Sequence, residues 1–254
     1  MHGRTLPWRQ PEVDGSFDPY KILVSEIMLQ QTQVNRVIPK YQAFLEAFPN
    51  VKALAAAPLS AVLALWNGLG YNRRAKYLHE AAKQLAPLSE PWTVDELAAC
   101  KGIGTNTAAA VVTYAYNQSI PFIETNIRTV FIHHFFKDAE VVSDKELTPL
   151  VAAALEREHS REWYWALMDY GSHLKVTVGN VSRMSKHYAR QSKFHGSKRQ
   201  LRGYILRVLI EKPHTRNELA QTNPDDRLEA VVADLLQEGL VMERYGRLFL
   251  GSTS

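Results

Sequence analysis

The 254-residue chain has 46% hydrophobic and 22% charged residues, a composition typical of a globular protein with one or two domains. Its single cysteine, Cys100, excludes an internal disulfide, a cysteine zinc site and a four-cysteine iron–sulfur cluster. No apolar run reaches the roughly 18–20 residues that span a bilayer, and the first residues lack the apolar core of a secretory signal. We therefore expect a cytoplasmic protein without a membrane partner.

Charge is distributed unevenly along the chain. The net charge is +4, but residues 1–170 hold 16 basic and 18 acidic residues, whereas residues 171–254 hold 14 basic and 8 acidic ones. No acidic residue occurs from Gly171 to Ile210. Such a run is either a solvated basic linker or a strip that binds the phosphates of a nucleic acid. The bases that we assign to this strip are Lys186, Arg190, Lys193, Lys198 and Arg199.

Helical periodicity dominates the first 190 residues. Prolines and glycines separate the periodic segments, and Ser143-Asp144-Lys145-Glu146 is a capping box that predicts a helix start. We find no convincing strand pattern before residue 239, so this part is expected to be all-helical. The expected helices are Tyr20–Gln33, Val37–Phe48, Leu59–Trp66, Arg73–Leu85, Val94–Cys100, Thr105–Tyr116, one from Ser143 to about Glu158, and one that begins with Trp163–Gly171.

The last 55 residues follow a different pattern. Two alternating segments, Leu240–Arg244 and Arg247–Leu250, flank Tyr245-Gly246 and predict a small β-hairpin. Three helices followed by a hairpin is the winged-helix plan, which binds either DNA or proteins. We favour DNA for this module. The three helices are expected at Gln200–Glu211, Thr215–Gln221 and Asp225–Glu238.

A glycine-containing turn joins two of the expected helices. In Lys101-Gly102-Ile103-Gly104 the glycines permit a tight turn, and Thr105, Asn106 and Thr107 begin the next helix. Backbone N–H groups and the helix dipole favour an anion at such a helix start, so the turn can bind a DNA phosphate; a plain interhelical turn is the alternative. Further along the chain, an apolar segment leads to Glu124-Thr125-Asn126 and brings a carboxylate to another helix start.

These features belong to five separate blocks that together resemble the helix-hairpin-helix (HhH-GPD) DNA glycosylases, and most closely the adenine-specific, MutY-type branch. The similarity extends over about residues 3–175. It implies a mainly α fold with a two-lobed, all-helical glycosylase domain, here followed by the winged-helix module. The blocks are Leu6-Pro7-Trp8-Arg9, Ser25–Val34, Trp66–Tyr71, the glycine turn and Met168-Asp169-Tyr170-Gly171.

The resemblance implies a domain layout. The glycosylase domain would occupy residues 1–175, with a six-helix lobe at about 20–135 and a second lobe formed by 1–19 and 136–190. Residues 176–199 would be the basic linker, and residues 200–254 the winged-helix domain.

The resemblance also implies the catalytic residues. Glu26 matches the glutamate that protonates the leaving adenine, and burial would raise its pKa as a general acid requires. Glu124 matches the catalytic aspartate that stabilises the sugar cation or activates the nucleophile. The longer glutamate moves the carboxylate by about an ångström, which leaves open either a working site or a weakened one. Asn126 matches an asparagine that supports this carboxylate, with helix capping as the alternative.

Other positions imply DNA contacts and an absence of lyase activity. Asn106 stands where bifunctional relatives carry the Schiff-base lysine, so a monofunctional enzyme is expected. Residues of two blocks match side chains that enter the duplex or contact the unpaired base, although a core role is the alternative for Tyr71. The DNA-contacting residues implied are Gln30, Gln31, Leu69, Gly70, Tyr71, Arg73, Gly102, Gly104, Thr105, Asn106 and Thr107.

Two departures from the family pattern affect the prediction. The four cysteines that hold an iron–sulfur cluster in most relatives correspond here to Lys175, Ser182, Ser185 and Gln191, so we expect no cofactor. The winged helix also replaces the usual C-terminal domain that recognises 8-oxoguanine. We expect a monomeric, nucleoid-associated, monofunctional glycosylase that removes adenine from mispaired duplex DNA. The alternatives are a glycosylase for thymine, uracil or another modified base, and a protein that binds lesions without cutting.

Overall fold

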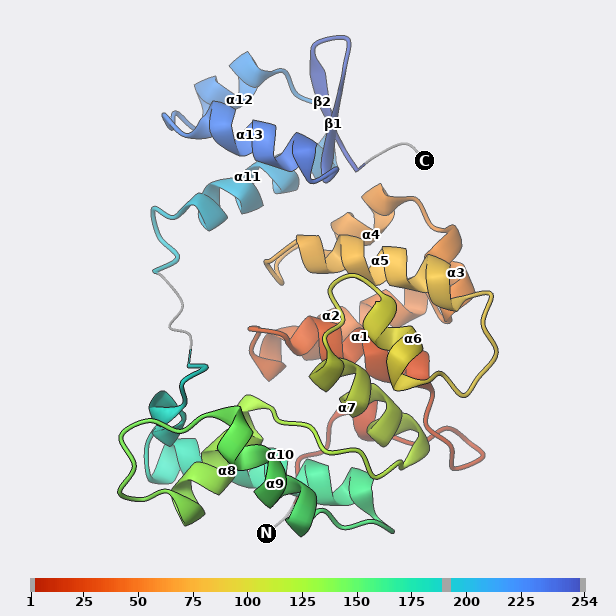
Figure 1. Cartoon of the computed structure of the whole chain (residues 1–254). Helices are drawn as coiled ribbons and strands as arrows, with labels where there is room; N and C mark the ends of the chain where they lie inside the picture. The colour runs from red at the N-terminus through yellow and green to blue at the C-terminus, as the bar shows by residue number, and fades with distance from the viewer. Residues whose placement is uncertain (1–2, 189–192, 252–254) are drawn as a thin grey trace. The chain divides into compact units, whose positions relative to one another are not determined.

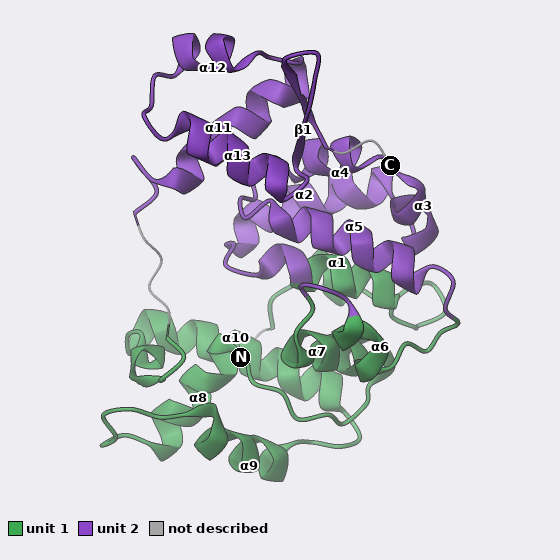
Figure 2. Cartoon of the chain, turned by 45° about the horizontal axis from the view of Figure 1, so that its top comes forward, with its two compact units in different colours: residues 1–26, 89–99, 103–190 green, residues 27–88, 100–102, 191–254 purple. Residues whose placement is uncertain are grey.

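The computed structural model describes residues 3–188 and 193–251. It is mainly helical, with one two-stranded antiparallel sheet near the C-terminus, which confirms the predicted fold class (Figure 1). The chain forms two compact units, coloured separately in Figure 2. Unit 1 contains residues 1–26, 89–99 and 103–190, and unit 2 contains residues 27–88, 100–102 and 191–254. The predicted domain boundaries stay a prediction. In the part of the chain that the structure describes, no helix has the length and apolar character needed to span a bilayer.

Unit 1 is built around two helices that approach each other closely. In α10, Gly171 lies against the backbone of Asn126 in α8, and a Cβ atom at Gly171 would stand 2.2 Å from the Asn126 carbonyl oxygen. Only glycine permits this distance, so the sequence block containing Gly171 determines how α8 is positioned. The elements of unit 1 are η1 (Pro7–Arg9), α6 (Val94–Ala99), α7 (Thr105–Tyr116), α8 (Thr125–Phe135), α9 (Asp144–Ala154), α10 (Ser160–Thr177) and η2 (Val181–Met184); α1 (Pro19–Leu29) begins in this unit.

An aromatic group holds the segment that leads into α8. Phe122 stacks on Tyr164 with ring centroids 3.9 Å apart. The Tyr164 hydroxyl donates to the Ile120 carbonyl and accepts from the Phe122 N–H, each at 3.0 Å. Both rings are buried. The segment 120–123 is thereby fixed along its backbone as well as through its side chains, and it delivers Glu124 to the start of α8.

Unit 2 combines helices from the first half of the chain with the C-terminal module. The hairpin pairs Val241 with Leu250 and Arg244 with Arg247, and its turn residues Tyr245 and Gly246 both have positive φ, as a tight hairpin turn requires. The module's first helix, α11, packs against α4 within this unit. The elements are α2 (Val34–Ala47), α3 (Val51–Ala56), α4 (Leu59–Trp66), α5 (Arg73–Leu85), α11 (Lys198–Glu211), α12 (Arg216–Thr222), α13 (Leu228–Gln237), β1 (Val241–Arg244) and β2 (Arg247–Leu250).

Several helix boundaries differ from the predicted ones. α1 ends at Leu29 rather than Gln33, because Gln31 adopts a left-handed backbone conformation with φ 54° that a helix cannot contain. α9 has the predicted capping box but ends at Ala154, before the predicted end near Glu158. α10 begins three residues before Trp163 and continues to Thr177. α3 was not predicted, although its N-cap, Asn50, accepts a hydrogen bond from the Ala53 N–H at 2.9 Å.

Candidate active site

Two carboxyl groups meet inside unit 1. Glu26 lies in α1 between buried Ser25 and Ile27, and Glu124 is the N-cap residue of α8. Their side chains share a hydrogen bond. Both residues keep some exposed surface although protein atoms surround their carboxyl groups, so the pair remains accessible to a substrate. The structure thus brings together the two acidic residues that the sequence assigned to catalysis.

Burial raises the pKa of both carboxyls because a charged carboxylate loses its hydration there. The pKa of Glu26 lies well above the ordinary 4.5, and the negative charge of Glu124 raises it further. For Glu124, the interaction with Glu26 and the charge of Arg128 lower the pKa and so offset part of the effect of burial. The balance of these effects favours the proton on Glu26 and the negative charge on Glu124. This is the division into acid and anion that glycosidic bond cleavage needs.

A buried ion-pair group stands beside Glu26. Arg9 donates to both carboxylate oxygens of Asp169, at 2.9 and 3.0 Å, and the Arg4 Nε donates to the same carboxylate at 2.6 Å. Burial works to raise the pKa of Asp169, but the bonds from Arg9 and Arg4 outweigh it and hold the pKa below 3.8. The Arg9 charge in turn lowers the pKa of Glu26 and so favours its anion. Sequence reasoning quoted Arg9 and Asp169 only as parts of blocks and assigned them no role.

Asn126 accepts a hydrogen bond from Lys175, one of the four residues that correspond to the iron–sulfur cysteines of relatives. The Lys175 Nζ in α10 donates to the Asn126 Oδ1 at 2.5 Å. Because an ammonium group has no acceptor, this bond assigns the amide oxygen to Lys175 and leaves the amide N–H groups facing elsewhere as donors. Burial lowers the pKa of Lys175, and the nearby Arg4 charge lowers it further. Asn126 is thus held from α10 and is more than a cap of α8.

The other cluster positions fall in η2 and beyond. Ser182 and Ser185 are buried, and Gln191 lies outside the described residues. The Val142 N–H donates to the Met184 carbonyl at 2.8 Å, and the Lys186 N–H donates to the Val142 carbonyl at 2.9 Å. Backbone bonds therefore fasten this segment to the residues that precede α9. The expectation that no cofactor is bound stays a prediction.

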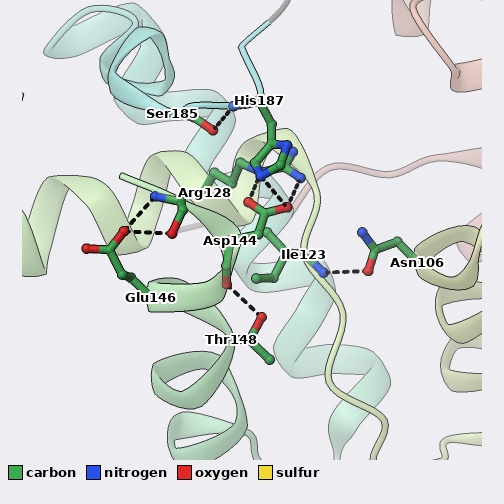
Figure 3. Close-up of polar contacts among 9 residues, drawn as sticks. Asn106, Ile123, Arg128, Asp144, Glu146, Thr148, Ser185 and His187 are labelled. Carbon is green, nitrogen blue, oxygen red and sulfur yellow. Dashed lines mark hydrogen bonds and ion pairs between the residues drawn. The ribbon is translucent and has the colours of Figure 1, made fainter. Parts of the chain in front are cut away.

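Figure 3 shows how polar contacts join the start of α9 to α8. The Arg128 guanidinium donates two bonds of 2.6 Å to the Asp144 carboxylate, and the His187 ring lies 4.0 Å from the same group. To one side, the Asn106 Oδ1 accepts from the Ile123 N–H at 3.4 Å. Asn106 therefore contacts the backbone one residue before Glu124. It is the residue that the sequence analysis matched to the Schiff-base lysine of bifunctional relatives.

The glycine turn has the geometry expected of an anion site. Gly102 has φ 88°, and a Cβ there would stand 2.6 Å from the Tyr77 ring, so no other residue fits without displacing it. Gly104 is the N-cap of α7, and it is exposed together with Thr105 and Asn106 in the first turn; Thr107 is half-buried. Exposed N–H groups at the start of a 12-residue helix can bind a phosphate. Whether they do so stays a prediction.

A buried arginine joins the two loops that were predicted to contact DNA. Loop 30–33 follows α1, and loop 67–72 precedes α5. Arg74 Nη1 donates to the Gln30 carbonyl at 2.5 Å, and its Nη2 donates to the Gly70 carbonyl and the Thr32 hydroxyl at 3.0 Å. Further Arg74 bonds go to the carbonyls of Ile27, Met28 and Leu69. No local pattern in the sequence indicates the Arg74 bonds to Ile27, Met28 and Gln30, because these residues lie more than 40 positions away.

The side chains of these loops differ in accessibility. Gln31 is exposed, Gln30 and Tyr71 are half-buried, and Arg73 is exposed. Gln31 and Tyr71 both have positive φ, 54° and 48°, which is uncommon for such residues and concentrates at functional sites. Leu69 is only 3% exposed, so its side chain packs inside unit 2, and its contact with DNA stays a prediction.

The predicted basic strip is partly occupied by internal contacts. Lys186 and Lys193 are exposed, whereas Arg190 lies outside the described residues. Lys198 and Arg199 lie in the first turn of α11. Lys198 pairs with Asp234, and Arg199 donates to the Tyr71 hydroxyl at 2.5 Å.

Comparisons with known proteins agree with this geometry. The pattern of the HhH-GPD superfamily base excision DNA repair proteins matches residues 24–152. The adenine DNA glycosylase of Mycolicibacterium smegmatis is 36% identical over 268 residues, covering 94% of this chain and 88% of that protein. The adenine DNA glycosylase of Mycobacterium tuberculosis H37Rv is 35% identical over 274 residues, covering 95% of this chain and 88% of that protein. Both matches therefore extend into the C-terminal module.

Solved structures share the fold. A thermostable thymine-DNA glycosylase aligns with a TM-score of 0.56 over 66% of this chain and 78% of that chain, at 23% identity. A trapped endonuclease III–DNA covalent intermediate aligns with a TM-score of 0.52 over 71% of this chain and 80% of that chain, at 17% identity. The chain belongs to the HhH-GPD superfamily of base excision DNA repair proteins. It is a DNA glycosylase of that superfamily.

Proposed function

We propose that this protein is a monofunctional adenine DNA glycosylase that removes adenine from a mispair in duplex DNA. The observation that carries the proposal is the meeting of two buried, interacting carboxyl groups, of which Glu26 has the more strongly raised pKa. Relatives named adenine DNA glycosylase, at 35–36% identity over most of the chain, support adenine as the base.

The chemistry follows from the two carboxyl groups. Glu26 gives its proton to the leaving adenine as the bond between the sugar C1′ and the base breaks, and the bond's electron pair leaves with the base. The Glu124 carboxylate stabilises the positive charge that develops on the sugar. Water then adds to C1′, and Glu124 accepts the water proton. The Arg9 charge favours the Glu26 anion that remains after proton transfer.

Lyase activity would need an amine that forms a Schiff base with C1′. Asn106 stands at the position where bifunctional relatives carry a lysine, and its amide oxygen is engaged with the Ile123 N–H. An amide cannot form that adduct. The protein therefore leaves an intact strand with an abasic site.

Each unit would contribute its own contacts to duplex DNA. The exposed first turn of α7 would hold a phosphate, and the half-buried Tyr71 and exposed Gln31 would enter the duplex where the adenine is extruded. The basic C-terminal part would add phosphate contacts through the exposed Lys186 and Lys193. We propose that the protein acts as a monomer and associates with the nucleoid through these contacts.

An excision assay tests the proposal. Labelled duplexes carrying A opposite 8-oxoguanine, G or C, and T·G and U·G pairs, are incubated with the protein and then treated with alkali. We expect strand breaks only after alkali and chiefly with mispaired adenine. Glu124→Gln should lower the rate at least a hundredfold, whereas Glu46→Gln, an exposed glutamate in α2, should leave it unchanged.

The other outcomes point to the alternatives. Cleavage of T·G or U·G duplexes but not of adenine mispairs would identify a thymine or uracil glycosylase. Tight binding without an abasic product on any duplex would identify a protein that binds lesions without cutting. Strand breaks without alkali would contradict the monofunctional assignment based on Asn106.

A further inference from the structure

The ring of Tyr71 is contacted by two guanidinium groups that come from different parts of unit 2. The Arg74 guanidinium carbon, in α5, lies 5.6 Å from the ring centroid, and that of Arg199, in α11, lies 5.3 Å from it. Arg199 Nη1 also donates to the Tyr71 hydroxyl at 2.5 Å. The ring is therefore held over its face by charge–π attraction and at its hydroxyl by a charge-assisted bond.

Separate contacts fix the C-terminal module close to Tyr71. The Lys76 Nζ in α5 donates to the Glu238 carbonyl at 2.7 Å, and Arg202 Nη1 in α11 donates to the Glu238 Oε1 at 3.1 Å. Near the chain end, Gly251 lies so close to Ser60 that a Cβ there would stand 2.8 Å from the Ser60 backbone nitrogen. These contacts join the module to α4 and α5 independently of Arg199. Arg199 consequently approaches Tyr71 from a held position.

The backbone conformation of Tyr71 shows what the contact with Arg199 adds. Tyr71 has φ 48°, an unfavourable conformation for a tyrosine, and it ends loop 67–72 one residue before Asn72 and α5. Arg74 holds the backbone of that loop through the Gly70 carbonyl. Arg199 adds a bond at the far end of the side chain, the Tyr71 hydroxyl, which the Arg74 bonds to the loop backbone do not reach.

We infer that Arg199 is a positioning residue for Tyr71, through which the C-terminal module takes part in probing the DNA duplex. This inference rests on the proposed function, because it assumes that Tyr71 enters the duplex. A ring that is held before DNA arrives does not lose its rotational freedom on binding, so less of the binding free energy is spent on ordering it. The module is then part of the lesion-reading surface and more than a phosphate-binding attachment.

A double-mutant cycle tests the pair. Arg199→Met removes the guanidinium, Tyr71→Phe removes the hydroxyl, and the third variant carries both changes. Excision kcat/KM on the best wild-type duplex and the Kd for a duplex with an abasic-site analogue are both measured. We expect each single change to weaken kcat/KM and DNA binding by roughly 3- to 10-fold. The double variant should be no more impaired than the more impaired of the two single variants. Arg199→Lys should recover part of the loss, because lysine can still donate to the hydroxyl.

Arg207→Met is the matched control. Arg207 lies on the same helix and stacks on Tyr204, with 5.7 Å from its guanidinium carbon to the ring centroid, so this change removes one positive charge without touching Tyr71. It should change kcat/KM by less than about twofold in 0.15 M salt, where surface charges are screened. An equal loss in Arg207→Met would overturn the inference in favour of bulk charge.

Two further outcomes would also overturn it. Effects of Arg199→Met and Tyr71→Phe that multiply in the double variant would mean that the residues act separately. A faster Arg199→Met enzyme would mean that Arg199 restrains Tyr71 from entering DNA. If the wild type excises no base, the proposed function fails, but the cycle in Kd still decides whether Arg199 positions Tyr71.

Discussion

In the proposed mechanism, Glu26 has to keep its proton until the base leaves, and the burial that raises its pKa has a cost in stability. Burial and the neighbouring Glu124 charge both disfavour the Glu26 anion. The Arg9–Asp169 pair beside it moderates this effect and becomes useful only after the proton has moved. The orientation of Asn126 is also fixed in advance. The Lys175 ammonium donates to its amide oxygen, so the amide N–H groups are the ones left to donate elsewhere. At the scale of single residues, the site is thus prepared for charge that appears during the reaction.

Replacing Glu26 with glutamine should exchange activity for stability. The folded-state pKa of Glu26 is raised above its ordinary 4.5, so its stabilising contribution is fully present below pH 4.5 and is lost as the pH rises through the raised pKa. Glutamine removes this loss. We expect Glu26→Gln to have a higher Tm than the wild type at pH 8, with the difference disappearing near pH 4.5, and to excise adenine about 10²–10⁴-fold more slowly.

Thermal unfolding between pH 4.5 and 8 measures this difference, with Glu46→Gln as the exposed control. A Tm difference that does not change with pH would show that Glu26 titrates normally. In that case the general-acid role assigned to Glu26 would lose its physical basis, even if the variant were inactive.

At the scale of elements, the features that could be predicted are those encoded locally. The helices 59–66, 73–85 and 105–116 have the predicted bounds because proline, glycine and polar residues mark their ends next to periodic apolar positions. The capping box at Ser143 and the hairpin turn at Tyr245-Gly246 are equally local. The early end of α1 was missed because no local pattern indicates the left-handed conformation of Gln31, or the bond from Arg74 to the neighbouring Gln30 carbonyl across 44 positions.

The candidate site divides in the same way. Glu26, Glu124 and Asn126 were predicted because they match residues of the family that the sequence resembles. Their partners were not, because each pairing joins residues far apart in the chain: Lys175 meets Asn126 across 49 positions, and Arg9 meets Asp169 across 160. Periodicity and spacing carry no information on such contacts, which arise only when α8 and α10 pack together.

Arg74 is the element-scale counterpart of these pairs, because one side chain joins the end of α1 to loop 67–72. Arg74→Met would remove the donors to five backbone carbonyls at once. We expect a loss of about 2–4 kcal/mol in the free energy of unfolding, since buried acceptors left without donors each cost about 1 kcal/mol or more. Urea unfolding followed by tryptophan fluorescence, to which buried Trp66 contributes beside Arg74, measures it.

The neighbouring Arg73→Met is the control for this change. Arg73 is exposed, and its Nε lies 3.9 Å from the Glu238 carboxylate. Removing its guanidinium should therefore lower the free energy of unfolding by less than about 1 kcal/mol. Equal unfolding free energies for the two variants would mean that the Arg74 bonds are replaced by water without loss. The two loops would then be held by apolar packing around Leu69 and not by the arginine.

At the scale of the whole molecule, the charge distribution matters more than the net charge of +4. The basic residues concentrate after residue 170, yet the structure pairs several of them with carboxylates of the C-terminal module, including Lys198 with Asp234 and Arg202 with Glu238. A base engaged in this way has less to gain from a DNA phosphate. Only part of the basic excess is therefore available for phosphate contacts.

The salt dependence of DNA binding separates available bases from engaged ones. For duplex DNA, log Kobs falls linearly with log salt, and each phosphate contact adds about 0.9 to the slope. We expect Lys193→Ala, at an exposed base, to reduce the slope by about that amount, and Lys198→Ala, at a paired base, to reduce it by less. Asp234→Asn should steepen the slope, because it releases the Lys198 ammonium. Equal slopes for Lys193→Ala and Lys198→Ala would show that the Lys198–Asp234 pair opens when DNA binds. Ion pairs within the folded module would then not limit how many of its basic residues contact DNA phosphates.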